Sequence, residues 1–176
     1  MTLHSLASRT LPVPDLPELA AEQPEDAAAI TALVDAAFGP GRFVKAAERL
    51  REANHPLLDL SFTAHAHGVL VGSVRLWSIH IGVQPAVFLG PIAVDPAWRK
   101  RGLGAALVRR ACEAAAEAGH CLVLLVGDPP FFGPLGFSMV PQGRVAMPGP
   151  VDPRRLMARP LVPGAAEHPQ GAVVPG

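Results

Sequence analysis

The residues best suited to binding chemistry stand close together at Arg99, Lys100, Arg101, Gly102 and Gly104, shortly after an apolar run that ends at residue 94. An Asp-Pro pair predicts a turn after that run, and the apolar spacing beyond it predicts a helix. The first N–H groups of a helix lack partners within the helix and carry partial positive charge. Glycine leaves these amides uncovered, so an anion can approach them. With three neighbouring cations, the segment predicts a phosphate-binding site.

Two common phosphate-binding motifs are excluded for this segment. A P-loop requires GxxxxGK[ST] and a dinucleotide-binding turn requires GxGxxG, and the sequence contains neither of them. The segment instead reads as strand, turn, RxxGxG and helix, a combination far more specific than two glycines alone.

Hydrophobic spacing predicts the elements that position this segment. Helices are expected over residues 24–38, 42–52 and 103–118, and strands over 60–66, 69–79, 86–94 and 121–127. His67 and Gly68 predict a tight turn between the first two strands. An antiparallel start followed by alternating strands and helices predicts an α/β fold around a mixed sheet.

Composition narrows the function classes. The 176 residues include 15 Lys and Arg and 15 Asp and Glu, so the neutral chain favours neither nucleic acid nor an anionic membrane as partner. The two cysteines are too few for a disulfide scaffold, and both are expected in the core. His65 and His67 share a strand face without a third ligand at suitable spacing, so no metal site is expected. No leader or membrane span is recognised, and a cytoplasmic location is expected.

Proline divides the chain unevenly. Residues 141–176 contain as many prolines as the whole of residues 25–140. We therefore expect a mobile N-terminal segment over 1–15, a folded domain over 16–140, and a Pro-rich C-terminal extension over 141–176 that packs on the domain as an extended wrap or a partly mobile tail.

Three segments in this order resemble the GNAT superfamily of acyl-CoA-dependent N-acetyltransferases: LGPIAVDP at 89–96, RKRGLG at 99–104 and LVGDPPFFGPLGF at 125–137. The resemblance covers roughly residues 16–140 and is similar to a bacterial subgroup that often carries a C-terminal extension. It implies a mixed, mostly antiparallel central sheet flanked by helices, in which one pair of strands splays apart to admit acyl-CoA.

The resemblance also implies the acetyl-CoA site. The amides that would face the CoA pyrophosphate belong to Lys100, Arg101, Gly102, Leu103, Gly104 and Ala105, with Arg99 at the leading position of the motif. The backbone of Ile92, Ala93 and Val94 would pair with the pantetheine arm. Pro91 has no N–H, so it predicts either a bulge or an unpaired edge position in this strand.

The family transfers the acetyl group by direct attack of an amine on the thioester, and its general acid is commonly a tyrosine. Phe132 occupies that position here, and the chain has no tyrosine. Asp128, Ser138 or a water are the candidate replacements, and Asp128 is expected as a helix or turn cap before Pro129, with a catalytic role as the alternative. Trp77 is expected in the core or on the sheet surface, with a substrate wall as the alternative.

Two functions follow from these residues. We expect an N-acetyltransferase that joins acetyl-CoA and an unidentified amine in one ternary complex, as a monomer or a homodimer. The alternative is a non-catalytic acyl-CoA-binding or regulatory module that has lost its general acid. The second helix carries a basic face made of Arg42, Lys45, Arg49 and Arg51. This face is expected to be solvated, with contact to an anionic substrate as the alternative.

Overall fold

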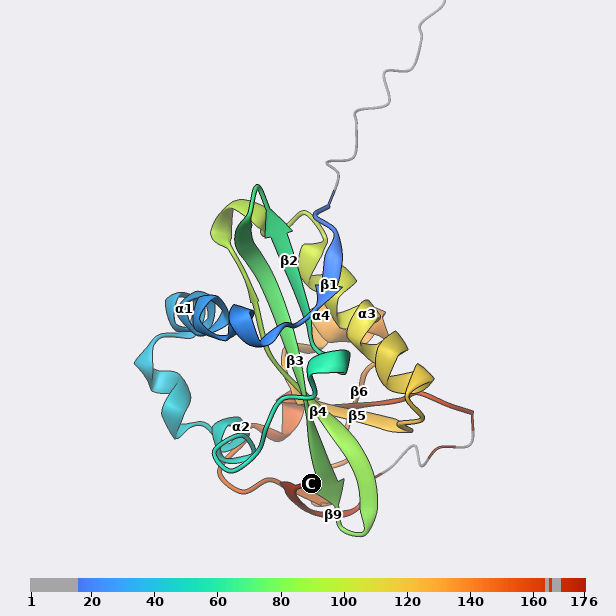
Figure 1. Cartoon of the computed structure of the whole chain (residues 1–176). Helices are drawn as coiled ribbons and strands as arrows, with labels where there is room; N and C mark the ends of the chain where they lie inside the picture. The colour runs from blue at the N-terminus through green and yellow to red at the C-terminus, as the bar shows by residue number, and fades with distance from the viewer. Residues whose placement is uncertain (1–15, 164, 166–168) are drawn as a thin grey trace, which may run out of the picture.

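A nine-stranded sheet forms the centre of the computed structural model, which describes residues 16–163, 165 and 169–176, apart from the side chains of Phe43 and Val44 (Figure 1). The strands are β1 (Leu19–Ala21), β2 (Phe62–Ala66), β3 (Val69–Ile81), β4 (Gln84–Val94), β5 (Leu122–Val126), β6 (Ser138–Met139), β7 (Val145–Ala146), β8 (Leu156–Pro160) and β9 (Gly171–Pro175). Their order is β1-β2-β3-β4-β5-β8-β6, with β9 beside β3 and β7 beside β9. Most pairs are antiparallel, and the mixed sheet confirms the predicted fold class. The predicted mobile segment 1–15 lies outside the described residues.

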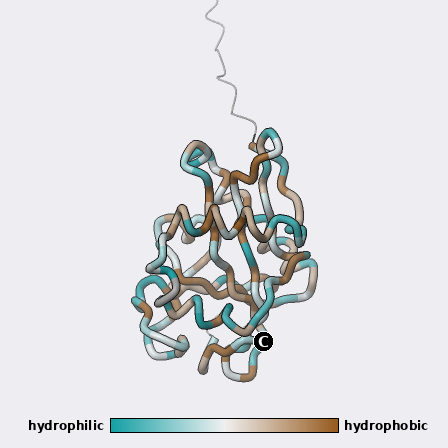
Figure 2. The backbone as a smooth tube through the Cα atoms, turned by 60° about the vertical axis from the view of Figure 1, so that its left-hand side comes forward, coloured by the Kyte–Doolittle hydropathy of each residue, from teal (hydrophilic) through white to brown (hydrophobic). Residues whose placement is uncertain are grey.

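Helices cover both faces of this sheet. They are α1 (Ala27–Phe38), α2 (Ala46–Arg49), α3 (Leu103–Glu117) and α4 (Pro129–Phe132). Helix α3 packs on one face and α1 on the other (Figure 1). Figure 2 shows hydrophobic stretches along the strands in the middle of the molecule. The predicted first and third helices are confirmed, and both end before a glycine with positive φ, Gly39 or Gly119.

The predicted second helix over residues 42–52 is wrong in its extent. Only α2 is helical there, and the backbone is extended at Lys45, between α2 and a preceding 3₁₀ turn. Glu48 pairs with both Arg42 and Arg51. A continuous helix would place residues 42 and 48 on different sides of its axis, so the break allows the first of these ion pairs.

The C-terminal residues belong to the sheet. The proline content of residues 141–176 predicts an extended wrap or tail without strands, yet β8 pairs with β5 along its whole length and β9 pairs with the far end of β3. Proline stands at the last position of both strands, where the lost donor matters least. The predicted boundary at residue 140 therefore lies between strands that pair with each other.

Three further expectations concern single residue types. Cys112 is buried, as expected, and burial raises the pKa of its thiol to about 11. Cys121 is exposed, contrary to expectation, because it lies in the turn before β5. Among the described residues, no group of three or more His, Cys, Asp or Glu could hold a metal ion. The helices of this part of the chain all lack the length and apolar character needed to cross a membrane.

Candidate acyl-donor and acceptor site

The candidate site lies where β4 and β5 separate. The two strands run parallel but pair only at Val87 with Val123 and Phe88 with Leu124, whereas β4 continues to Val94. On its other edge, β5 stays paired with β8 throughout. The gap that opens beyond Phe88 is the splayed strand pair that the resemblance to the GNAT superfamily implies.

A β-bulge bends β4 at the start of this gap. The register of β3 against β4 shifts between Val74 and Leu76. Arg75 therefore lies opposite two residues of β4, Gly90 and Pro91, which confirms the bulge predicted from the missing N–H of proline. The bulge also exchanges the faces of the strand: residues 87 and 89 before it and residues 92 and 94 after it all pack toward α3.

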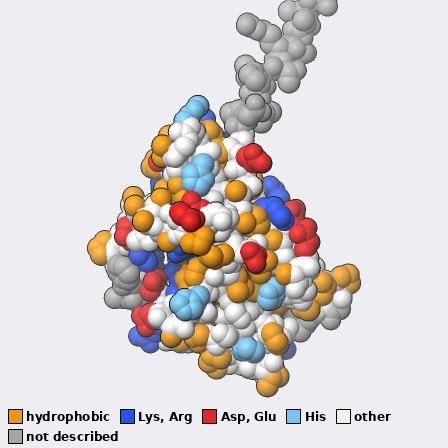
Figure 3. Space-filling model, in the orientation of Figure 1, with side chains coloured by type: hydrophobic (Ala, Val, Ile, Leu, Met, Phe, Trp, Pro, Cys, Tyr) orange, Lys and Arg blue, Asp and Glu red, His pale blue; other side chains and the backbone are white. Residues whose placement is uncertain are grey.

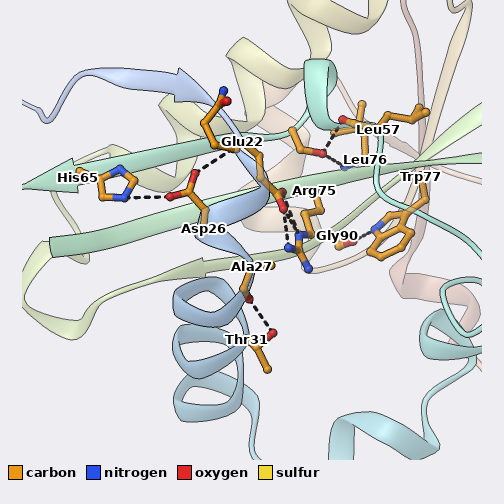
Figure 4. A network of polar contacts seen from close by, with 12 residues as sticks. Glu22, Asp26, Ala27, Thr31, Leu57, His65, Arg75, Leu76, Trp77 and Gly90 are labelled. Carbon is orange, nitrogen blue, oxygen red and sulfur yellow. Dashed lines mark hydrogen bonds and ion pairs between the residues drawn. The ribbon is translucent and has the colours of Figure 1, made fainter. Parts of the chain in front are cut away.

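One polar contact from β3 holds the bulge, and a second fixes the side chain of Arg75 opposite it (Figure 4). The indole N–H of Trp77 donates to the carbonyl of Gly90 at 2.6 Å. Arg75 forms a two-pronged ion pair with the buried carboxylate of Glu22, at 2.9 Å from Nε to the nearer oxygen. Trp77 is buried, as predicted, and the contact to Gly90 was not foreseen.

The backbone beyond the bulge presents alternate N–H groups to the gap. Asp95 donates its N–H to Val71 of β3. Because successive residues of a strand direct their N–H groups to opposite edges, Ala93 also faces β3, whereas Ile92 and Val94 face the gap. The carbonyl of Val94 accepts from Nε of Arg99 at 3.0 Å. Of the three residues expected to pair with pantetheine, two thus face the gap.

The start of α3 closes one end of the gap. Gly102 caps the helix with φ of +89°, and the first helical bond runs from the N–H of Ala106 to the carbonyl of Gly102. The N–H groups of residues 103–105 therefore have no acceptor within the helix. A Cβ added at Gly104 would lie 3.5 Å from the ring of Phe131 and 3.7 Å from Val94. These amides consequently lie beside the end of β4.

Three cations surround the same helix start. Arg99, Lys100 and Arg101 are exposed, and the guanidinium of Arg101 lies 5.2 Å from the ring centre of Trp98. Unpaired amides, positive helix-end potential and exposed basic side chains meet here without an intervening carboxylate among the residues of this turn, 99–105. The arrangement suits a phosphate-rich anion.

A cavity of about 400 Å³ lies at the other end of the gap. Its wall includes residues 89–92 of β4 and 126–128 at the end of β5, which are the two margins of the gap. The rest of the wall comes from Phe88, α1, the segment around α2, Phe132, and residues 150–152 and 155. Figure 3 shows a hollow with charged side chains between α1 and α2. The gap therefore joins the basic helix start to this cavity.

Charged side chains from the α2 region line this cavity. Arg42 and Arg51 are only 14% and 13% exposed, so the predicted solvated face is wrong for these two residues. Glu48 lies between them, at 3.3 Å from Arg42 and 2.9 Å from Arg51. Burial lowers the pKa of Arg51, an effect that Glu48 opposes. The carboxylate at position 48 was the overlooked signal, because it reveals that the basic face is partly buried and paired.

The three candidate acid–base positions occupy different surroundings. Phe132 is buried and lines the cavity, with its ring against Gly127. Asp128 also lines the cavity, but its side chain is 73% exposed and lies 3.2 Å from Arg155. Ser138 lies on β6, is exposed, and is not part of the cavity wall. Only the first two meet at the site.

Comparison with known proteins places this geometry in a family. A sequence model of the acetyltransferase (GNAT) family matches residues 27–131, from α1 to α4. The chain belongs to the GNAT family. It is 30% identical over 120 residues to the uncharacterised N-acetyltransferase YhbS of Escherichia coli K12. The aligned region covers 67% of this chain and 71% of the relative.

Two solved GNAT structures are similar over nearly the whole chain. The E. coli YhbS structure in complex with CoA has a TM-score of 0.78 at 25% identity and covers 93% of this chain and 92% of that one. A Brucella melitensis GNAT acetyltransferase in complex with acetyl-CoA has a TM-score of 0.66 at 25% identity. The match covers 90% of this chain and 95% of that one. The likeness to these GNAT structures thus extends beyond the family match at residue 131.

We predict that Trp77→Phe destabilises the protein through the bulge. The substitution keeps most of the buried ring but leaves the carbonyl of Gly90 without its donor, which costs about 1–3 kcal/mol. Urea unfolding followed by circular dichroism measures the loss. Trp98→Phe is the control, since its ring contacts Arg101 and makes no hydrogen bond to a described residue. Equal free energies of unfolding for wild type and Trp77→Phe would contradict the role of the indole.

Proposed function

We propose that this GNAT protein transfers an acetyl group from acetyl-CoA to an amine. The observation that carries the proposal is the continuity of the gap: the unpaired edge of β4 runs from the basic start of α3 to the cavity. Two similar structures contain CoA and acetyl-CoA, which supports the same donor here.

The donor would bind along this edge in three parts. The pyrophosphate would accept from the N–H groups of residues 103–105, with Arg99, Lys100 and Arg101 around it. The pantetheine amides would pair with Ile92 and Val94 in the manner of an added strand. The thioester would then reach the cavity beside the bulge.

The reaction would proceed in one ternary complex. The neutral amine nitrogen attacks the thioester carbon, the C–S bond breaks, and its electron pair leaves on sulfur. The thiolate then takes up one proton while the new amide loses one. Neither cysteine lines the cavity, so the proposal contains no acyl-enzyme.

Proton transfer would depend on Asp128 or on water. Phe132 has no proton to give, and the 3.2 Å contact to Arg155 holds the Asp128 carboxylate at the cavity wall. Asp128 can therefore take the proton that the amine loses, directly or through a water. Positioning of the two reactants supplies much of the acceleration in such a reaction.

The absence of tyrosine from the sequence supports a second function, a module that binds acetyl-CoA without turnover. Both functions share the donor site and differ only in whether an amine reacts. The cytoplasmic location and the homodimer remain predictions from sequence.

Gly104→Glu is predicted to weaken acetyl-CoA binding by about 100-fold or more. The added carboxylate would displace the pyrophosphate from the N–H groups of the helix start, and the loss of two hydrogen bonds to this charged group costs about 3 kcal/mol. Gly104→Ala is the matched control, since its Cβ meets only ordinary contacts at 3.5 Å and beyond. It should bind within about tenfold of wild type. Titration calorimetry gives both dissociation constants. A folded Gly104→Glu protein with wild-type affinity would exclude the helix start as the pyrophosphate site.

Phe132→Tyr separates the two functions. We expect wild-type transfer to a panel of amines, with a faster kcat in the tyrosine variant, because a general acid contributes about 10²–10⁴-fold where protonation limits the rate. Thiol release and mass spectrometry of the product measure turnover. Acetyl-CoA binding without transfer in wild type, together with transfer in Phe132→Tyr, would instead establish the binding module.

A further inference from the structure

Arg51 lines the cavity and carries a buried hydrogen-bond donor without a partner among the described residues. Its Nη1 donates to Glu48 at 2.9 Å. Its Nε is buried, and neither Nε nor Nη2 has a hydrogen-bond partner among the described residues. A buried guanidinium normally has an acceptor for each of its N–H groups. The Nε–Nη2 edge of Arg51 is an exception, because it lacks an acceptor among the described residues.

The same edge binds a carboxylate elsewhere in this protein. Arg75 uses its Nε and Nη2 to hold both oxygens of Glu22 (Figure 4). This two-pronged geometry matches the planar guanidinium to the planar carboxylate. The Nε–Nη2 edge of Arg51 therefore has the same pair of donors that Arg75 uses to bind the carboxylate of Glu22.

The guanidinium of Arg51 is fixed next to the bulge. Its central carbon lies 5.8 Å from the ring centre of Phe88. A Cβ added at Gly90 would lie 3.4 Å from its Nη2. Gly90 belongs to the margin of the gap, so an anion held by Arg51 would lie close to the incoming thioester.

The charge on the cavity wall also favours an anion. The positive side chains of this wall are Arg42, Lys45, Arg51 and Arg155, and the negative ones are Glu48, Asp128 and Asp152. Four positive and three negative charges leave one positive charge in excess. Because desolvation disfavours the buried Arg51 cation, a bound anion would stabilise it.

We propose that Arg51 binds the carboxylate of the acceptor through its free Nε–Nη2 edge, so that the acceptor is a short amino carboxylic acid. This inference rests on the proposed acetyl transfer. Because the guanidinium lies beside Gly90, where the thioester would enter, the proposal places only one or two carbon atoms between the amine and the carboxylate. An α- or β-amino acid meets this condition, whereas a lysine side chain in a protein does not.

Transfer kinetics test the acceptor class. The panel contains glycine, alanine, phenylalanine and glutamate, each paired with its α-carboxamide. For at least one pair, we expect kcat/KM about 100-fold higher for the acid than for the amide, since a buried charge pair contributes at this level. Arg51→Gln should remove this preference by raising KM for the amino acid, and leave KM for acetyl-CoA unchanged.

Arg49→Gln is the matched control. Arg49 lies on α2 too, but it is exposed, donates to the carbonyl of Pro148 and does not line the cavity. It should keep the preference for the acid.

Arg51→Lys retains the charge without the two-pronged edge, and should recover only part of the preference. If amides react as well as acids, or Arg51→Gln keeps the preference, the inference is wrong while acetyl transfer stands.

A binding measurement separates failure of this inference from failure of the proposed function. N-Acetylated forms of the same four amino acids and of their amides are titrated into the CoA-saturated protein and, separately, into the CoA-free protein. Tighter binding of an acid than of its amide, lost in Arg51→Gln, supports the carboxylate site even without turnover. Equal binding, or binding of neither, overturns it. Absence of acetyl-CoA binding would count against the proposed function alone.

Discussion

The early end of pairing between β4 and β5 is the constraint on which the site depends. After Phe88 and Leu124 the strands part, and β5 is held on its other side by β8. The N–H groups of Ile92 and Val94 are left facing a gap. Open strand edges readily pair with another extended chain, because their backbone N–H and C=O groups lack hydrogen-bond partners. In the proposed complex, the pantetheine arm of acetyl-CoA would supply such a partner.

The bulge connects the donor end of the site to the acceptor end. Trp77 holds it from β3, and Arg51 lies against Gly90 from the cavity. A single backbone irregularity at the start of the gap therefore sets which residues of β4 face it, and a buried cation lies beside it. The C-terminal strands complete this arrangement, since β8 fixes the edge of β5 that faces away from the gap.

Local features of the site could be predicted from sequence and distant ones could not. The glycine-rich helix start and the bulge at Pro91 follow from the backbone properties of single residues. The C-terminal strands depend on β5, more than 30 residues earlier in the chain. Hydrophobic periodicity carries no information about such partners, nor about the ion pairs of Glu48 that accompany the break in the second helix. The burial of Arg51 depends in the same way on Phe88 and Gly90 of β4.

Single-residue amide hydrogen exchange by NMR, with and without acetyl-CoA, tests the central claim most directly. Binding of the donor along β4 should slow exchange at Ile92, Val94 and residues 103–105. Ala93, whose N–H faces β3, should change little and serves as an internal reference. Saturation with acetyl-CoA that leaves these amides unchanged, and slows exchange only in other parts of the sheet, would contradict the account.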